Sequence, residues 1–438
     1  TSPDWPPPAE PVRLASLQVP EPPTAYITSA ISFEASWKPP TSVGCTVTKY
    51  ELQLCSRDGL PIGQPVNVPA TSTTYLFKDL EMGSTFTTRV IAEAEAGPET
   101  NRSVMRSVEW SRASEPLSLP AVAVPIAPRL EVKSATSLEA TWTVPDVFAC
   151  KLTKVELQLC GREGGPLGDP VLVDAGESRF LFSDQRAGDS FSVKIQAHAT
   201  ASGAADGATT VSVTSTEWSL PARAVTLPLV EVPAAPKVYA VSATGIDIDW
   251  VLPAVTACLL ESVTVQLCDG DGNEIGQPVR KGATESTHRF TELSTGGKYS
   301  ARISGQGTSS RRQRLSVATE SFQEEGGTTF SLSSAAFSPN APVVTIPSVD
   351  VAAAPKMYLE SATSVTVSWT LPSMSACELE RYELQLNDAS GATISSVTIA
   401  EGKSTHTFDG REAGSKLTAR VKAEARHPMG FVVEAADW

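Results

Sequence analysis

The sequence is poor in the residues on which catalysis and metal binding usually depend. It has only four histidines in 438 residues, and they do not recur at matched positions beside a nucleophile. It contains no GxSxG, P-loop or HExxH motif, and no GxGxxG followed by an acidic ribose ligand. We therefore predict a non-enzymatic protein with no catalytic, cofactor-binding or metal-binding residues.

Long apolar runs are missing too. No stretch approaches the ~20 apolar residues of a membrane-spanning helix, and residues 1–5 lack the basic and apolar regions of a signal peptide. The net charge is −14, which repels nucleic acid and anionic lipid. We expect other proteins as partners, and neither nucleic acid binding nor membrane insertion within these residues.

A four-fold internal repeat is the main feature that is present. Each repeat has a tryptophan followed within three residues by proline, at Trp37, Trp142, Trp250 and Trp369. About a dozen residues later each has an alternating run: Tyr50–Leu54, Val155–Leu159, Val263–Leu267 and Tyr382–Leu386. Strict alternation indicates a strand with one buried face. Tyr50, Leu52 and Leu54 are therefore expected to point inward.

Two further segments recur in each repeat. One is a strand that begins three residues after a glycine; it covers Phe86–Ala92, Phe191–Ala197, Tyr299–Gly305 and Leu417–Ala423. The other is a last strand that opens with an aromatic residue: Trp110, Trp218, Phe337 or Trp438. No segment of a dozen residues has helical periodicity. Short strands with regular turn signals indicate a sandwich or a barrel.

Together these motifs resemble the fibronectin type III family over nearly the whole chain. The resemblance implies an all-β tandem array of four immunoglobulin-like, seven-stranded β-sandwiches. One departure from the family is visible, because its corner tyrosine is present only as Tyr299. Phe86, Phe191 and Leu417 replace it elsewhere and should lose a hydrogen bond of about 1 kcal/mol each.

The repeats predict the domain limits. We expect the last strand of a preceding repeat plus a linker at 1–20, and repeats at 21–125, 126–233, 234–352 and 353–438. The third repeat has a long insertion before its last strand, and the fourth is truncated at its last strand. Because both ends fall inside a repeat, we expect a fragment of a longer array.

The seven cysteines follow the repeat. Three repeats have two cysteines ten positions apart, and the fourth has one: Cys45 and Cys55, Cys150 and Cys160, Cys258 and Cys268, and Cys377. Cysteines at the two ends of one strand lie roughly 30 Å apart, too far for a disulfide. The fold that the resemblance implies allows bonds between neighbours: Cys55 with Cys150, Cys160 with Cys258, and Cys268 with Cys377. Cys45 would stay unpaired. The alternative is seven reduced, partly buried thiols.

A cation–aromatic ladder is expected on the outer face of the sixth strand. Its pairs are Arg89 with Trp110, Lys194 with Trp218, Arg302 with Phe337, and Arg420 with Trp438. Gln53 and its equivalents would extend the ladder. Such contacts contribute about 0.5–1 kcal/mol each when exposed, so we favour a structural role over ligand contact.

Three loop features are weaker candidates for binding or modification. Arg311, Arg312 and Arg314 in the third repeat form a basic cluster that could bind an acidic partner, or simply be solvated. Asn101 begins the only glycosylation sequon. The run Asp269–Glu274 resembles a calcium loop but lacks its downstream glutamate, so a hairpin turn is favoured.

Two functions remain open. One is an extracellular or cell-surface structural or adhesive rod that mediates protein–protein interaction. The other is an intracellular cytoskeletal scaffold with reduced cysteines. A weaker alternative is a set of spacer modules belonging to a larger enzyme. Neighbouring repeats of the same chain are expected partners in each case.

Overall fold

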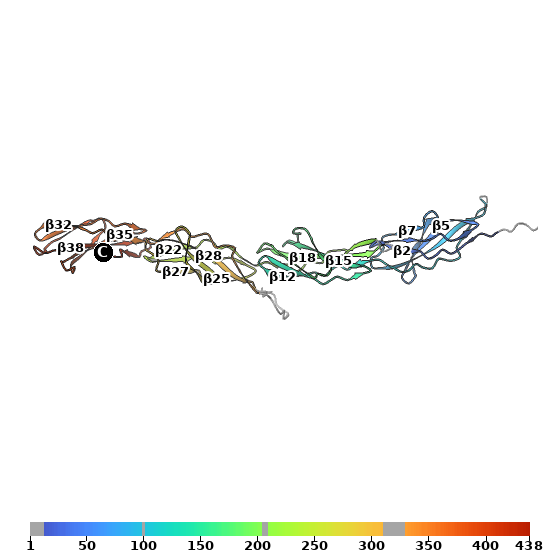
Figure 1. The fold of residues 1–438 in the computed structure, drawn as a ribbon, viewed down its shortest axis with the longest axis horizontal. Coiled ribbons are helices and arrows are strands. Elements are labelled where there is room, and N and C mark those ends of the chain that lie inside the picture. The colour runs from blue at the N-terminus through green and yellow to red at the C-terminus, as the bar shows by residue number, and fades with distance from the viewer. Residues whose placement is uncertain (1–12, 99–100, 204–208, 310–328) are drawn as a thin grey trace, which may run out of the picture. The chain divides into compact units, whose positions relative to one another are not determined.

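The structure is a computed structural model that describes residues 13–98, 101–203, 209–309 and 329–438. Every regular element in these residues is a β-strand, so the described part contains no helix that could cross a membrane. The strands form four sandwiches, each with a small three-stranded sheet facing a large sheet of four or five strands. The chain colour of Figure 1 runs from blue in the first sandwich to red in the fourth. The predicted all-β tandem fold is confirmed.

The first sandwich shows the common plan. Its small sheet contains β2 (Thr24–Ser29), β3 (Ser32–Ser36) and β7 (Thr74–Phe77). Its large sheet contains β6 (Pro61–Pro69), β5 (Cys45–Ser56), β8 (Thr85–Ala96), β9 (Ser103–Arg106) and β10 (Leu117–Ser118). A two-residue ladder of β1 (Ser16–Leu17) and β4 (Ser42–Val43) closes one end. All pairings are antiparallel.

The second sandwich repeats this plan. The small sheet contains β12 (Arg129–Ser134), β13 (Ser137–Thr141) and β17 (Arg179–Phe182). The large sheet contains β16 (Val171–Asp174), β15 (Lys151–Cys160), β18 (Ser190–Ser202), β19 (Thr210–Thr214) and β20 (Val225–Thr226). The closing ladder is β11 (Ala121–Val122) with β14 (Val147–Phe148).

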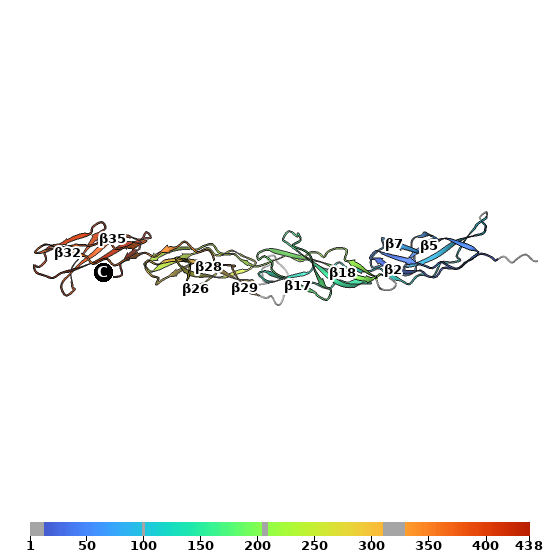
Figure 2. The ribbon, with the colours of Figure 1, turned by 45° about the horizontal axis from the view of Figure 1, so that its top comes forward.

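The third and fourth sandwiches differ mainly at their last strands. The third contains β22 (Lys237–Ser242), β23 (Gly245–Asp249), β27 (Thr287–Phe290), β26 (Glu274–Gly282), β25 (Leu259–Asp269), β28 (Lys298–Ser309), β29 (Phe330–Ser333) and β30 (Val344–Thr345), which Figure 2 shows in part. The fourth contains β32 (Lys356–Ser361), β33 (Ser364–Ser368), β37 (Thr405–Phe408), β36 (Thr393–Ala400), β35 (Glu378–Asn387), β38 (Thr418–Arg426) and β39 (Val432–Glu434). Their ladders are β21 (Leu229–Val230) with β24 (Val255–Thr256), and β31 (Ser348–Val349) with β34 (Met374–Ser375).

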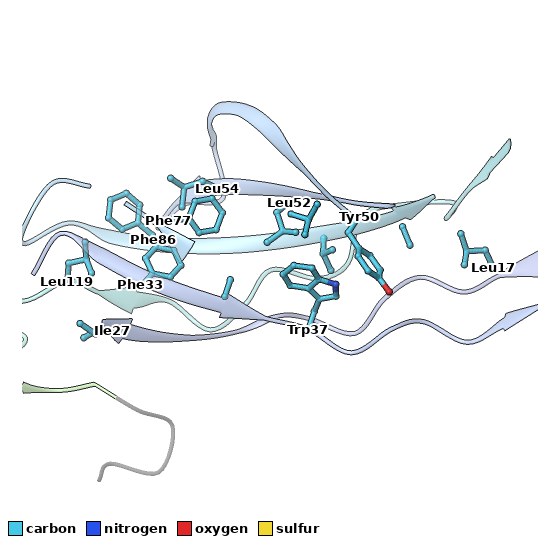
Figure 3. Close-up of a cluster of buried hydrophobic side chains, with 14 of the residues drawn as sticks. Leu17, Ile27, Phe33, Trp37, Tyr50, Leu52, Leu54, Phe77, Phe86 and Leu119 are labelled. Atoms are coloured by element: carbon cyan, nitrogen blue, oxygen red, sulfur yellow. The ribbon is translucent and has the colours of Figure 1, made fainter. Parts of the chain in front are cut away.

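Each sandwich has its own core. In the first, Tyr50, Leu52 and Leu54 are buried on the inner face of β5, as the alternation predicted. Trp37 packs edge-on against Tyr50, with their ring centroids 5.4 Å apart. Figure 3 shows this pair beside each other, with Leu17 beyond it, and Phe33, Phe77 and Phe86 toward the other end of the cluster. The repeated tryptophan therefore supports the inner face of the strand that follows it.

The corner tyrosine behaves as the resemblance implied. The hydroxyl oxygen of Tyr299 accepts a hydrogen bond from the backbone N–H of Ser294 at 3.1 Å. Phe86 and Phe191 are buried at the same position and have no hydroxyl to offer. Those sandwiches rely on apolar burial alone at this corner.

The predicted position of the last strand is wrong. Trp110 does not open a strand but lies in an irregular segment between β9 and β10, both of which pair with β8. Trp218 and Phe337 lie in the same kind of segment. The long insertion of the third repeat lies between β28 and β29, and these two strands pair with each other.

The chain forms two compact units, Thr1–Thr226 and Leu227–Trp438, and each contains two sandwiches. Within a unit, two residues separate the last strand of one sandwich from the first ladder of the next. They are Leu119-Pro120 in the first unit and Ile346-Pro347 in the second. The predicted repeat starts at 21, 126, 234 and 353 each fall between this first ladder strand and the strand that follows it.

Candidate functional site

The structure brings together the predicted cation–aromatic pairs on the outer face of each large sheet. The cation lies 5.0 Å from the ring centroid for Arg89 over Trp110 and for Lys194 over Trp218. The corresponding distances are 4.9 Å for Arg302 over Phe337 and 4.6 Å for Arg420 over Trp438. Arg106 lies on Trp110 as well, at 5.8 Å. These side chains form one surface per sandwich, which we call the outer ladder.

Buried serines hold the aromatic segment of the first sandwich against β8. Ser107, Ser111 and Ser114 donate their backbone N–H groups to the carbonyls of Ala92, Val90 and Thr88. Their hydroxyl oxygens accept from the backbone N–H groups of the same three β8 residues. The segment advances three or four residues for every two of β8, so it cannot form a regular ladder. The serine hydroxyls supply the acceptors that a regular strand would have provided.

The serine pattern recurs in the next two sandwiches. Ser215 and Ser219 bond β18 in this way, and Ser334 and Ser338 bond β28. The recurring aromatic residue was identified from the sequence, but the serine three residues before it was missed. Its signal was the recurring serine itself at Ser107, Ser215 and Ser334.

Gln53 was predicted to belong to the outer ladder, but it has a different role. Its side chain is only 3% exposed, and its amide Nε2 donates to the carbonyls of Leu54, Ile62 and Gly63 at 2.8, 3.1 and 3.3 Å. The register of β5 with β6 shifts beside it, so these carbonyls lie at a bulge. Gln158 and Gln266 make equivalent bonds.

Gln385 is the one equivalent that extends the outer ladder. Its Oε1 accepts from Nε and Nη2 of Arg420 at 2.9 and 2.7 Å. The difference follows from the position of the register shift, which lies between Leu386 and Asn387 in the fourth sandwich but across Gln53 in the first. Gln385 therefore pairs regularly with β36, and its side chain bonds the arginine.

All seven cysteines are free thiols, so the predicted bonds of Cys55 with Cys150, Cys160 with Cys258, and Cys268 with Cys377 are not formed. Each sulfur instead donates to a backbone carbonyl of its own sandwich. Cys45, Cys150, Cys258 and Cys377 donate to the first ladder strand, at 3.3 to 3.4 Å. Cys55, Cys160 and Cys268 lie buried on the outer face and donate to the carbonyl two residues earlier. The disulfide prediction is therefore corrected.

Burial raises the pKa of six of these thiols above the ordinary cysteine value. For Cys55, the Arg89 guanidinium lowers the pKa by a smaller amount, so burial dominates. A raised pKa means that folding favours the neutral thiol. This stabilisation is complete below the ordinary thiol pKa of about 8.5 and is lost as pH rises through the raised value.

The remaining candidates do not form a site together. Arg311, Arg312 and Arg314 lie outside the described residues. Asn101 is exposed on the loop between β8 and β9.

The calcium-like run is a hairpin turn. The side-chain amide of Asn273 donates to Asp269 Oδ2, and the backbone N–H groups of Asn273 and Asp271 donate to its Oδ1; these bonds lower the pKa of Asp269. Within the described residues no cluster of three histidine, cysteine or acidic side chains could hold a metal ion.

Comparison with known proteins agrees with this geometry. Residues 19–108 match the family described as "Fibronectin type III domain". The first sandwich belongs to this family. The other three sandwiches have the same arrangement of a small sheet and a large sheet, with one strand fewer in the large sheet of the fourth, so the chain is a tandem array of sandwiches with this fold. Among curated proteins no match is found.

Two solved structures from chicken are similar to this chain. The FN1–FN3 domains of CNTN1 are 15% identical with a TM-score of 0.25, covering 75% of this chain and 98% of that one. A two-domain fibronectin type III segment of tenascin is 18% identical with a TM-score of 0.19, covering 47% and 97%.

Replacing Gln53 with alanine should lower the free energy of unfolding of the first sandwich by about 1–3 kcal/mol, because buried carbonyls lose their donor. Urea unfolding measures the change. Gln385→Ala is the matched control and should cost less, because that site is half-exposed and water can replace the amide. Equal losses in the two variants would contradict the assigned role of Gln53.

Without reductant, a thiol reagent should titrate seven cysteines once the chain is unfolded in denaturant, because no disulfide is present. In the folded chain at neutral pH, Cys55, Cys160 and Cys268 should react last, since each is at most 2% exposed. Fewer than seven thiols in denaturant would contradict the assignment of every cysteine as free.

Proposed function

We propose that this chain is a non-enzymatic structural or adhesive spacer whose fibronectin type III modules mediate protein–protein interaction. The observation that carries this proposal is the two-residue joint between sandwiches of one unit. A spacer must fix the distance between what lies on either side of it, and these joints leave no free linker.

The first joint is bonded and packed along its whole length. Leu119 is fully buried in the core of the first sandwich, and its N–H donates to the Ser84 carbonyl at 2.9 Å. Proline follows, which has a fixed φ. The next residue, Ala121, already pairs with β14 of the second sandwich. A β-carbon at Gly83 would lie 3.3 Å from the Cβ of Ala121, so the turn and the ladder are in close contact.

The joint of the second unit has the same construction. Ile346 is fully buried in the third core, and its N–H donates to the Gly297 carbonyl at 2.9 Å. Ser348 then pairs with β34, and its Cβ lies 3.4 Å from the position of a β-carbon at Gly296. Because both joints are built in the same way, the position of each sandwich on its neighbour within a unit is a selected feature and not a chance contact.

Apolar turn residues add a second contact at each of these joints. Ala30, in the β2–β3 turn, packs against the buried cluster of Val122, Ala197, Ala199 and Val213 in the second sandwich. Ala243, in the β22–β23 turn, packs against the core of the fourth. Contacts on two sides of a short joint restrict bending in more than one direction.

We place this spacer at the cell surface or outside the cell, supported by the exposed sequon at Asn101. The free thiols favour a second candidate, an intracellular scaffold, because reduced cysteines are usual there. Protein isolated from its own cells decides between them. A glycan on Asn101 requires the secretory route, whereas a bare Asn101 with seven free thiols supports the scaffold.

Two spin labels, one at Lys78 in the first sandwich and one at Glu163 in the second, should show a narrow distribution of label-to-label distances. Inserting Gly-Ser-Gly-Ser between Pro120 and Ala121 should broaden it, because the joint gains free backbone. Pulsed dipolar spectroscopy with labelled non-native amino acids measures both. The same insertion between Asp58 and Gly59, in an exposed turn, is the control and should not broaden it. A parent distribution as broad as that of the joint insertion would contradict the spacer.

A further inference from the structure

One edge of every large sheet is formed by a strand with an unpaired side. These edge strands are β6, β16, β26 and β36, and within the described residues each pairs with one neighbour only. An open edge presents unpaired N–H and C=O groups that can pair with another chain. Natural sheets usually block such edges with proline, bulges or charge.

Three of the four edges are blocked in the same way. A valine on the edge strand pairs with the inward residue before the glutamine of the central strand: Val66 with Leu52, Val171 with Leu157, and Val279 with Val265. The residue just before that valine is Pro65, Pro170 or Pro278. Two residues earlier again is a glycine with φ of +64° to +67° at Gly63, Gly168 and Gly276. The proline removes a donor, and the glycine lies at a bulge in β6 and β26 and just before the start of β16.

The fourth edge has neither device. Val397 pairs with Leu384 at the equivalent position, but Ser396 stands where the proline stands in the other three. The whole of β36, Thr-Ile-Ser-Ser-Val-Thr-Ile-Ala, contains no proline, glycine or charged residue. Its ladder with β35 runs without a shift from Ala400 to Ser395, and its one register shift lies at Ile394, near the start of the strand. Five of its eight residues are β-branched and suit an extended strand.

We propose that β36 pairs antiparallel with β36 of a second copy of this chain, which joins two large sheets into one. In a two-fold pair each strand faces itself, so a charge near the axis would oppose its own copy. β26 carries Arg280 and Lys281 and would be repelled in this way. β36 is neutral throughout and meets the condition.

The register of this pairing follows from the alternation of β36. A two-fold axis through Ser396 places Ile394 of one copy opposite Thr398 of the other. Ile394 is 48% exposed, so pairing would cover apolar surface. Glu383, on the neighbouring strand β35, is charged. Its carboxylate accepts hydrogen bonds from the side chains of Ser396 and Gln385 at 3.1 and 3.0 Å and is therefore held within its own sheet.

The association should be weak. Stable interfaces bury about 1,200–2,000 Å² in total, and eight paired residues provide less than that. We therefore expect a monomer–dimer equilibrium that depends on concentration. This inference is independent of the proposed spacer role, since the joints and the β36 edge are separate structures.

Sedimentation equilibrium of the full chain over a range of concentrations tests the proposal. The parent chain should dimerise reversibly. Ser396→Pro should weaken dimerisation at least about ten-fold, the effect of losing ~1.4 kcal/mol. It copies the residue that the other three sandwiches carry at this position, so the fold should accept it. Ser396→Lys should weaken dimerisation as well, because two lysines would meet at the axis.

Ser404→Lys is the matched control. It adds the same charge to an exposed loop residue away from the edge and should dimerise like the parent. Circular dichroism checks that each variant is folded. A parent chain that stays monomeric up to its solubility limit would overturn the proposal. So would folded Ser396→Pro and Ser396→Lys variants that dimerise as the parent does.

Discussion

The burial of one aliphatic side chain at each joint is the constraint on which the arrangement within a unit depends. Leu119 and Ile346 are both fully buried in the sandwich that they leave. The chain is then committed to the next sandwich within two residues. The residue that completes one core therefore also fixes where the next begins. The burial of this one side chain therefore stabilises one sandwich and also positions the next.

A second constraint acts within each sandwich, on the strand that carries the ladder cations. In the first sandwich, β8 pairs on one side with the regular strand β5 and on the other with an irregular serine-capped segment. That segment carries Trp110 over Arg89. Gln53, Cys55 and Thr87 are also buried, although they lie on the outer face of the sheet and point away from the core. Their polar groups must be bonded locally, and for Gln53 the bulge of β6 provides the acceptors.

Much of the fold could be predicted from the sequence because alternation and turn residues are local signals. The inward positions Tyr50, Leu52 and Leu54 and the cation–aromatic pairs follow from spacing along strands, and the corner at Tyr299 follows from the resemblance to the fibronectin type III family. Gln53 could not be assigned in this way, because its bonds depend on a bulge in a different strand. The position of Trp110 was misjudged because a serine-capped segment has no regular period. The cysteine pairs failed because each thiol bonds a carbonyl of its own sandwich, a contact that spacing alone does not reveal.

Hydrogen exchange of the full chain, compared between the parent and Leu119→Ala, tests the joint most directly. Removing this buried side chain should cost about 2–5 kcal/mol. Exchange should become faster both in β8 of the first sandwich and in the β11–β14 ladder of the second, since one residue supports both. Unchanged exchange in the second sandwich would show that core and joint are separate, and would contradict the shared role of Leu119.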